Sequence, residues 1–374
     1  MSSPSSPVFP DTSGTQAAEI PSSRRLRRWK TLLVVVLLAL LVATAWQLLN
    51  RQQTSMIAGR PLSYPQTHLH TVAMSSRPGM VYLGTHYGLF TSTDGGQSWP
   101  QSQGVLNTTM VTAVAVSPSN PDLLAVLTIP TSGLGRQMGV YVSADAGKHW
   151  RFSVPANLPS TSYPYTIANG LGAQGHFYVF FSYAGWFETR DLGQHWYPIT
   201  SGNLANIQTP SLLTDPTNSA HLLMGGDQGL FETQNGGQSW QKISAVQGYV
   251  NALAATTSSA GRPRTILAAT DQGLYRWQDG QQVTQISKLP ASTPPTRMVV
   301  SADGSALYAL FGTDLWFSAN LGTTWVHRWH FTRGDLVALV LNSVNPRQIL
   351  AGFFTPGLVL ISNDAGKSWQ TLTN

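Results

Sequence analysis

Short apolar runs recur along most of the chain, separated by turns that are rich in Gly, Pro, Asn and Asp. Short apolar runs between turn residues are typical of β-strands. Each unit begins with two such strands, for example residues 111–116 followed by 123–127. A third strand then opens with Gly and two large residues, here Gly139, Val140 and Tyr141. Because this strand is apolar on successive residues, it predicts sheets that are packed on both faces.

The third strand of each unit leads into an octapeptide that the chain repeats. It reads STDGGQSW at residues 92–99 and returns as SADAGKHW, TRDLGQHW, TQNGGQSW, SANLGTTW and SNDAGKSW, with a degenerate copy, WQDG, at residues 277–280. The repeated Asp or Asn residues are Asp94, Asp145, Asp191, Asn235, Asp279, Asn320 and Asp364, and the repeated Trp residues are Trp99, Trp150, Trp196, Trp240, Trp325 and Trp369. The Asp and Asn positions are 51, 46, 44, 44, 41 and 44 residues apart. This spacing is the period of a propeller blade.

Each residue type in the repeated octapeptide has a structural use. The short Asp or Asn side chain accepts hydrogen bonds from the backbone of its own turn. The Gly two positions later permits a positive φ angle. The final Trp opens a fourth strand and is large enough to pack between neighbouring sheets. These properties predict a β-turn and a contact between sheets, not a catalytic group.

The octapeptide resembles the Asp-box repeat of sialidase-type (BNR) propellers, S-x-D-x-G-x-[ST]-W. The resemblance covers about residues 66–374, and the six well-preserved copies are in register. Proteins that share the box include sialidases, some xyloglucan-cleaving glycoside hydrolases, sortilin-like receptors and photosystem II assembly factors. The resemblance therefore implies an architecture and leaves the function open.

The predicted fold class is all-β: a seven-bladed β-propeller of four-stranded antiparallel blades, preceded by one N-terminal transmembrane helix. We divide the chain into a disordered basic cytoplasmic tail at residues 1–30, the helix at 31–49, a stalk at 50–65 and the propeller at 66–374. The last unit contains all four strands. The ring is therefore expected to close by packing alone, unless residues 60–68 add a strand.

The N-terminal helix is predicted from an apolar run at residues 32–49 that follows a cluster of Arg and Lys. A helix of this length spans about 27 Å, close to the hydrocarbon thickness of a bilayer. The basic cluster should hold the N-terminus in the cytoplasm. The lipid bilayer is thus an expected partner of residues 32–49, with the propeller outside the cytoplasm at the cell membrane. Secretion after signal cleavage near Ala45 is the alternative.

Charge distinguishes the two parts of the chain. Residues 1–65 carry seven Lys/Arg and two acidic residues, whereas residues 66–374 carry fifteen Lys/Arg and fourteen acidic residues. A nearly neutral propeller lacks the basic surface of nucleic-acid-binding proteins, so no nucleic-acid partner is expected. The chain contains no Cys, which excludes disulfides, thiolate metal sites and a Cys nucleophile.

The candidate binding surface is the face opposite the octapeptide turns, because those turns all fall on one face of a propeller. The opposite face is built from the loops after the second and fourth strands. Tyr, His, Trp and Arg recur in these loops and are good binding anchors, although scattered aromatic residues are also normal at surfaces. The candidate binding residues are His86, Tyr87, Arg136, Tyr163, Tyr183, Arg297, Trp329 and Arg333.

A glycoside hydrolase is the alternative to a binding module. The resemblance implies that a sialidase needs an arginine triad, for which Arg136, Arg297 and Arg333 lie on plausible loops, and a Tyr–Glu pair. The two Glu residues of the propeller, Glu188 and Glu232, share one repeat position near the octapeptide, which indicates a structural role.

A hydrolase that uses two Asp residues is a second form of this alternative. Asp227 and Asp271 occupy equivalent loops of adjacent units, with Asp314 near the corresponding position of the next. Two carboxylates several ångströms apart can perform acid–base chemistry. The sequence Asp-Gln-Gly is, however, also typical of a tight turn that opens a strand.

No catalytic residue, metal site or cofactor is predicted. His327 and His330 are three residues apart, but their predicted setting in a loop does not favour a metal. The sequence favours a membrane-anchored extracytoplasmic propeller that binds a protein or glycan partner without catalysis. It does not indicate which partner.

Overall fold

The computed structural model describes residue 62 and residues 67–102, 104–130, 137–172, 174–200, 202–208, 210–259 and 263–373. The chain divides into Met1–Ser55 and Met56–Asn374, and every described residue belongs to the second unit. The predicted tail, transmembrane helix and nearly all of the stalk lie outside the described residues. Within the part that is described, no helix is long and apolar enough to cross a membrane.

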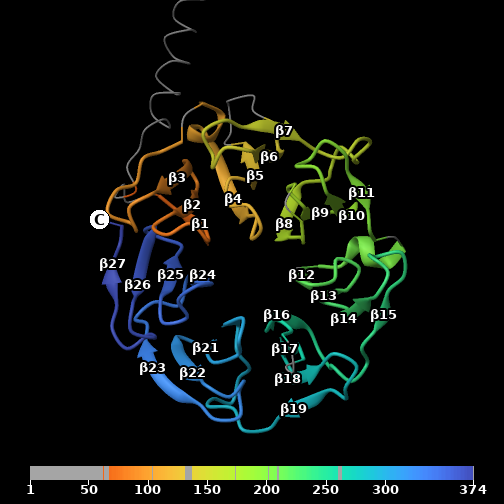
Figure 1. Cartoon of the computed structure of the whole chain (residues 1–374), viewed down its shortest axis with the longest axis vertical. Helices are drawn as coiled ribbons and strands as arrows, with labels where there is room; N and C mark the ends of the chain where they lie inside the picture. The colour runs from red at the N-terminus through yellow and green to blue at the C-terminus, as the bar shows by residue number, and fades with distance from the viewer. Residues whose placement is uncertain are drawn as a thin grey trace, which may run out of the picture. The chain divides into compact units, whose positions relative to one another are not determined.

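Seven antiparallel sheets follow one another around a central opening, and each is made of consecutive strands (Figure 1). Blade 1 contains β1 (Leu69–Met74), β2 (Val81–Thr85) and β3 (Gly88–Ser92). Blade 2 contains β4 (Thr109–Val116), β5 (Leu124–Pro130), β6 (Gly139–Ser143) and β7 (Arg151–Ser153). Blade 3 contains β8 (Pro164–Asn169), β9 (Phe177–Phe181), β10 (Gly185–Thr189) and β11 (Tyr197–Pro198). Two short 3-10 helices, η1 (Gly104–Asn107) and η2 (Gly202–Asn206), follow blades 1 and 3.

The remaining four blades have the same strand order. Blade 4 contains β12 (Ser211–Thr214), β13 (Leu222–Gly226), β14 (Gly229–Thr233) and β15 (Gln241–Lys242), and blade 5 contains β16 (Val250–Ala255), β17 (Thr265–Thr270), β18 (Gly273–Gln278) and β19 (Thr284–Ile286). Blade 6 contains β20 (Arg297–Val300), β21 (Leu307–Phe311), β22 (Asp314–Ser318) and β23 (Val326–His330). Blade 7 contains β24 (Leu336–Leu341), β25 (Ile349–Phe353), β26 (Leu358–Ser362) and β27 (Gln370–Thr371).

The predicted seven-bladed propeller of antiparallel blades is confirmed. Two local predictions differ from the structure. The fourth strand of blade 1 is reduced to a single bridge between Phe90 and Gln101. The segment from His327 to His330, predicted as a loop, instead belongs to strand β23, because β22 offers it a partner edge.

Hydrophobic clusters fill all seven seams between neighbouring blades. The seam between blades 1 and 2, for example, contains Tyr82 and Leu89 from one blade and Val111, Leu124 and Val126 from the other. The second and third strands are mostly buried because each has a neighbouring blade on both sides. This two-sided burial is the reason for their continuous apolar sequence.

The ring closes between blades 1 and 7 without an exchanged strand, since β24 to β27 form blade 7 by themselves. Two backbone hydrogen bonds reinforce the packing at this seam. The N–H of Leu69 donates to the carbonyl oxygen of Phe354 at 3.0 Å, and that of Gly357 donates to the carbonyl oxygen of Thr67 at 2.7 Å. Closure therefore uses hydrogen bonds as well as packing, and one of these bonds is made by Thr67, within the segment 60–68 that the sequence left open as an additional strand.

The repeated octapeptide folds into one recurring turn. In the first copy, Asp94 Oδ1 accepts hydrogen bonds from the backbone N–H groups of Gln97 at 2.9 Å and Ser98 at 3.0 Å. Ser92 Oγ donates to the same carboxylate at 2.7 Å and accepts from the N–H of Gly96 at 2.7 Å. A corresponding set of bonds is found at Asp145, Asp191, Asn235, Asn320 and Asp364.

The Trp that ends each full octapeptide packs into the seam with the preceding blade. This holds for Trp99, Trp150, Trp196, Trp240, Trp325 and Trp369. Blade 5, whose octapeptide is degenerate, has Thr284 at the Trp position. Trp277, located on β18, fills the equivalent seam with blade 4 instead and is 6% exposed.

Candidate functional site

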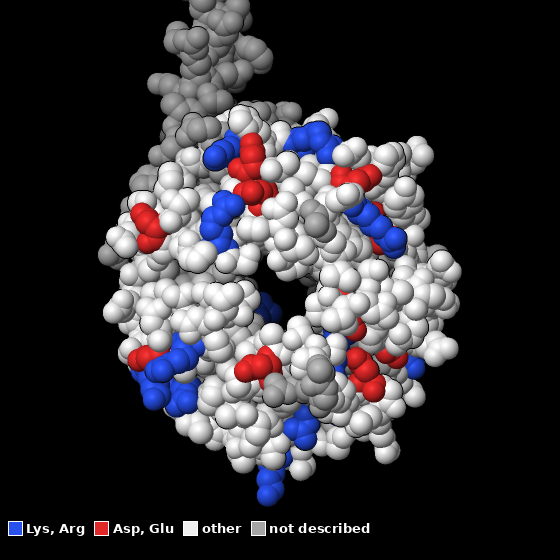
Figure 2. Space-filling view, viewed as in Figure 1, with Lys and Arg blue, Asp and Glu red and all other residues white. Residues whose placement is uncertain are grey.

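The antiparallel connections give the ring two different faces. The loops between the first and second strands and between the third and fourth strands, which include the recurring turns, form what we call the turn face. The loops after the second and fourth strands form the opposite side, the loop face. Figure 2 shows one side of the ring, on which acidic and basic side chains lie in small mixed groups around the central opening.

Blades 3 and 4 form a pocket of about 550 Å³ on the loop face, which we call the tyrosine pocket. It brings together two of the predicted residues, Tyr163 and Tyr183, with Tyr165, which the sequence analysis did not single out. The pocket is lined by Tyr163, Tyr165, Phe180, Ser182, Tyr183, Asn206, Ile207, Gln208 and Pro210. All three tyrosines are exposed, and Tyr183 is 67% exposed.

Local hydrogen bonds hold the tyrosines in place. The turn between β9 and β10 places Tyr183 at φ 60°, a left-handed conformation that costs free energy in a residue with a side chain. The N–H of Ser182 donates to the carbonyl oxygen of Tyr163 at 3.0 Å, and the N–H of Tyr163 donates to Ser182 Oγ at 3.1 Å. A strained backbone that presents an exposed aromatic ring is a feature that clusters at functional sites.

The tyrosine pocket is mainly apolar, with a few polar groups and no charged side chain. The nine described residues that line it include no Lys, Arg, Asp or Glu. The nearby carboxylate of Asp227 accepts a hydrogen bond from the backbone N–H of Gln208 at 2.7 Å and so fixes the pocket's edge. Burial raises the pKa of the neighbouring Tyr249, and the charges of Tyr165 and Asp227 add to this effect. The available groups are therefore aromatic faces, hydroxyls and amides.

His86 and Tyr87, also predicted, lie at the seam of blades 1 and 7. The ring of His86 is 5.7 Å from that of His68 and 6.1 Å from that of His70, while His68 stacks on Phe354 at 4.6 Å. Burial, aided by the other two imidazoles, lowers the pKa of His70 to about 4. This imidazole cluster with Phe354 was not visible in the sequence because residue 354 of blade 7 meets residues 68 and 86 of blade 1 only when the ring closes.

The other predicted binding residues are not brought together. Arg136 lies outside the described residues. Arg333 is held by Asp335, with Nε to Oδ1 at 2.9 Å, and also donates to the carbonyl oxygen of Thr355. Arg297 is exposed at the start of β20. Trp329 lies on strand β23, where it packs against the core of blades 6 and 7, so it is not the loop residue that was predicted.

The carboxylates considered for hydrolysis have structural partners. Asp227 Oδ1 accepts from the N–H of Gln208, and Asp271 Oδ1 accepts from the N–H of Tyr249 at 2.8 Å. Each therefore connects its loop to the preceding one, as expected for a turn. Asp314 accepts hydrogen bonds from two histidines, His327 and His330.

The two Glu residues lie on the turn-face side and pair with histidines that precede the second strands. Glu188 Oε2 is 3.1 Å from His176 Nε2, and Glu232 Oε1 is 2.7 Å from His221 Nε2. Blade 5 has Arg264 at the position of these histidines. The sequence contained a signal for these positions, because His176, His221 and Arg264 each directly precede the second strand of their blade.

Arg264 forms a buried ionic cluster between blades 4 and 5. Its guanidinium, in a side chain that is 1% exposed, lies 3.1 Å from Asp215 Oδ2, which is also 3.2 Å from His221 Nδ1. Asp279, the degenerate octapeptide position, faces this cluster, and burial raises the pKa of its carboxyl group. Asp215, His221 and Asp279 are close enough to share a metal ion. The guanidinium, however, already supplies the compensating positive charge.

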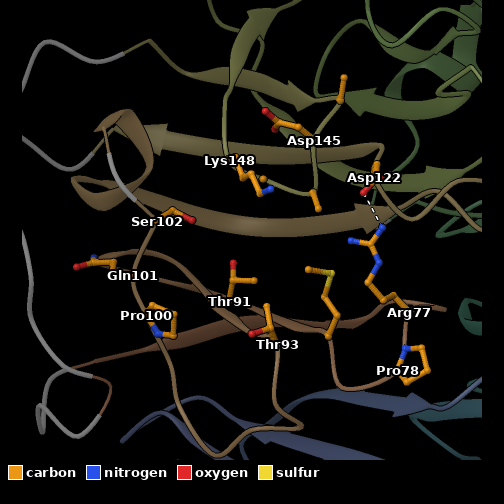
Figure 3. A pocket seen from close by; sticks show the side chains of 14 residues that line it. Arg77, Pro78, Thr91, Thr93, Pro100, Gln101, Ser102, Asp122, Asp145 and Lys148 are labelled. Carbon is orange, nitrogen blue, oxygen red and sulfur yellow. Dashed lines mark hydrogen bonds and ion pairs between the residues drawn. The ribbon is translucent and has the colours of Figure 1, made fainter.

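Another cleft, of about 790 Å³, lies between blades 1 and 2 (Figure 3). It is lined by Thr91, Thr93 and Pro100 from blade 1 and by Asp145 and Lys148 of the blade 2 turn. The ion pair between Arg77 and Asp122, 2.8 Å apart, closes one end. Thr93, Asp145 and Lys148 belong to the recurring turns, and Arg77 and Asp122 are paired with each other, so we assign less functional weight to this cleft than to the tyrosine pocket.

The fold and its faces define the class: a seven-bladed β-propeller. No protein-family model and no curated protein matches the sequence. Among solved structures, a GH74 xyloglucanase from Xanthomonas campestris is 16% identical with a TM-score of 0.65, covering 84% of this chain and 56% of that one. An ancestral GH74 enzyme is 18% identical with a TM-score of 0.60, covering 82% and 46%. The chain thus spans about half the length of these two structures.

YCF48 from Cyanidioschyzon merolae has a similar fold over nearly its whole length. It is 14% identical with a TM-score of 0.55, and the match covers 80% of this chain and 96% of that one. At these identities the likeness concerns the fold alone. The propellers it resembles include both GH74 enzymes and YCF48.

Proposed function

We propose that this chain is a non-enzymatic binding module that holds a protein or glycan partner at the tyrosine pocket. The observation that supports this is the group of three exposed tyrosines around one uncharged pocket, with Tyr183 kept in a strained backbone conformation. Tyrosine presents a large rigid surface together with a hydroxyl group, and it is therefore enriched at binding interfaces.

A matched pair of variants tests this proposal. Tyr183→Ala removes a pocket residue, whereas Tyr197→Ala removes another exposed tyrosine of blade 3, on strand β11, that does not line the pocket. Crosslinking in the native membrane, followed by identification of captured molecules, should lose its specific partner in Tyr183→Ala and keep it in Tyr197→Ala. Equal capture by both variants would reject the tyrosine pocket as the site.

We further propose that residues 31–49 anchor the protein in the cell membrane, with the N-terminus in the cytoplasm and the propeller outside. The apolar run and its basic flank support this arrangement. Protease treatment of intact cells should digest the propeller and leave the N-terminal tail protected. A mature N-terminus near residue 45, found in the culture medium, would support secretion instead.

A glycoside hydrolase is the second candidate. It is supported by the fold shared with GH74 enzymes and by the equivalent positions of Asp227 and Asp271 in adjacent blades. The hydrogen bonds that connect these carboxylates to backbone N–H groups favour a structural role. Turnover of a panel of aryl glycosides that disappears in folded Asp227→Asn or Asp271→Asn protein would favour the enzyme over the binding module.

A further inference from the structure

Basic side chains from two neighbouring blades gather at the turn-face end of the seam between blades 6 and 7. Figure 2 shows a group of Lys and Arg side chains at the lower left of the ring, beside β23. The residues that meet at this seam are Arg328 on β23, Arg347 between β24 and β25, and Lys367 in the recurring turn of blade 7. Arg347 and Lys367 are exposed, and Arg328 is partly buried. We call these three residues the basic patch.

Contacts of the recurring turn place the three residues of the basic patch side by side. The carbonyl oxygen of Arg347 accepts a hydrogen bond from the N–H of Ala365 at 2.9 Å. A Cβ atom placed on Gly366 would lie 3.4 Å from Cβ of Arg328. Burial raises the pKa of Tyr308 to about 12, and the charges of Arg328 and Arg347 both oppose this rise. Both guanidinium groups therefore lie near the same hydroxyl, beside the turn of blade 7.

The positive charges of the basic patch exceed the negative charge beside them. Among the residues that the structure describes, none of the three takes part in an ion pair. The carboxylate beside them, that of Asp364, accepts hydrogen bonds from the N–H groups of Lys367 and Ser368 and from the hydroxyl groups of Ser362 and Ser368. Those bonds all lie within its own turn, so both arginines and the Lys367 ammonium group stay available to another anion.

The same position of the repeat in blade 2 has a different environment. Lys148 corresponds to Lys367 in the octapeptide, but it lines a cleft together with Asp122 and Asp145. The carboxylate of Asp122 is paired with Arg77 at 2.8 Å. Acidic and basic groups are balanced in that cleft, so the excess of positive charge at blades 6 and 7 is not a consequence of the repeat itself.

The point at which the chain enters the propeller also lies on the turn-face side. Leu62, which precedes β1, packs in the seam of blades 1 and 7. It lines a surface hollow with Gln97, from the recurring turn of blade 1, and with Leu372. The chain therefore reaches the propeller beside a recurring turn as it continues from residues 31–49, for which we proposed a membrane anchor.

We propose that the basic patch contacts the phosphate groups of an anionic lipid bilayer and so holds the propeller with its turn face toward the membrane. Lys and Arg side chains near an anionic lipid surface are attracted to it. Separate, exposed side chains suit such an extended surface, because each can reach a different head group. The proposal rests on the membrane anchor at residues 31–49, and it leaves the tyrosine pocket on the face directed away from the lipid.

Energy transfer from a single dye to a labelled lipid tests this orientation. The chain contains no Cys, so Ser343→Cys, in the same loop as Arg347, gives one dye site on the turn face, and Ser292→Cys gives one on the loop face. The full-length protein is reconstituted into vesicles of phosphatidylcholine with or without phosphatidylglycerol. Transfer from the dye at Ser343→Cys should be higher with the anionic lipid and should decrease as salt is added. Transfer from the dye at Ser292→Cys should stay low in both.

Variants that remove equal charge assign the effect to the basic patch. Arg347→Gln combined with Lys367→Gln removes two exposed charges of the patch and retains Arg328. Lys148→Gln combined with Arg297→Gln removes the same charge from two exposed positions elsewhere. The ratio of protein with its turn face at the lipid to protein held away from it should fall roughly fivefold for each patch charge removed. The control pair should leave this ratio unchanged.

The outcomes separate this proposal from the membrane anchor. Thermal melts establish that the variants are folded, and Lys367→Gln alone serves if the double variant is not. The proposal is overturned if transfer from Ser343→Cys is independent of lipid charge, or if the patch variant and the control pair lose it equally. Loss of the protein from neutral vesicles on washing would reject the anchor. The protein is then added to the anionic vesicles, where the same comparison of variants supports or overturns the basic patch.

Discussion

The turn face and the loop face of this propeller differ in how they use the repeat. On the turn face the same hydrogen bonds recur in six blades, from Asp94 to Asp364, and the following Trp fills a seam each time. The described loop face carries different exposed groups at different blades, although Asp227 and Asp271 occupy equivalent loops of blades 4 and 5. Tyrosines gather at blades 3 and 4, imidazoles at blades 1 and 7, and a carboxylate with two histidines at blade 6.

This difference indicates that the turn face stabilises the ring and that the loop face is available for recognition. The electrostatics agree with this division. Although its slight burial alone would raise the pKa, hydrogen bonds from the backbone and ring of His149 lower the pKa of Asp145 to about 2. The carboxylate of Asp145 thus finds its hydrogen-bond partners within its own turn. A left-handed backbone does not distinguish the two faces, since Ala146, Leu192, Leu321 and Ala365 of the recurring turns adopt positive φ angles as Tyr183 does on the loop face.

The largest expected effect concerns the buried cluster of blades 4 and 5. Arg264→Ala leaves Asp215 without its guanidinium partner in a site where both side chains are almost inaccessible. We expect the free energy of unfolding to fall by about 3–5 kcal/mol. Urea denaturation measures this, with the exposed Arg297→Ala as a control expected to change stability by less than about 0.5 kcal/mol. A loss below about 1 kcal/mol would contradict the assigned role of the cluster.

The imidazole cluster should make the seam of blades 1 and 7 sensitive to acid. Because the folded-state pKa of His70 is about 4 and its unfolded value is 6.5, the unfolded chain binds the extra proton first as pH falls. Stability is therefore highest above pH 6.5 and decreases down to about pH 4. Strands β4 and β24, which flank β1, carry no titratable residue that would offset this.

A variant isolates this pH effect from general acid denaturation. His70→Gln should lose about 1–2 kcal/mol less than the unchanged protein between pH 7 and pH 4, a value reduced from the full pKa shift because His70 is partly exposed. Denaturant melts at the two pH values provide the comparison. If the free energy of unfolding depends on pH in the same way in both proteins, His70 is not the cause of the acid sensitivity.

On the turn face, a single hydroxyl should have a measurable effect. Thr189 Oγ1 donates to Asp191 Oδ1 at 2.9 Å and accepts from the N–H of Gly193 at 2.7 Å. Thr189→Ala leaves that buried N–H unsatisfied and should lower the free energy of unfolding by about 1–2 kcal/mol. Thr189→Ser retains the hydroxyl, so a chemical melt should show it close to the unchanged protein. Equal losses in both variants would assign the effect to the methyl group.

The smallest effect has the opposite sign and lies on the loop face. Tyr183→Gly removes the strain at φ 60° but adds backbone freedom, so we expect a gain of about 0.5–1 kcal/mol. Tyr163→Gly, without that strain, should lose stability. A thermal melt of each variant makes the comparison, and a clear loss in Tyr183→Gly would show that the ring stabilises the fold more than the backbone strains it.

The sequence determined the seven blades because the recurring turn is local. Eight residues contain the acceptor, the hydroxyl, the glycine and the tryptophan, so the pattern can be recognised without knowing what surrounds it. At the degenerate copy a β-turn still forms, closed by the N–H of Gln281 donating to the carbonyl oxygen of Gln278 at 2.9 Å, but Asp279 faces the ionic cluster with Arg264. Blade 5 keeps its seam through Trp277, at a position that no local pattern identifies.

Tertiary structure alone decided which loop residues meet. Tyr163, Tyr183 and Gln208 share a pocket because blades 3 and 4 pack side by side. Asp314 meets His327 and His330 because a bulge shifts one strand by a residue. Such contacts depend on strand register and on the packing of neighbouring blades, which are set by the whole ring. Spacing along the chain therefore predicted the propeller, whereas only strand register and the packing of neighbouring blades brought the candidate groups together.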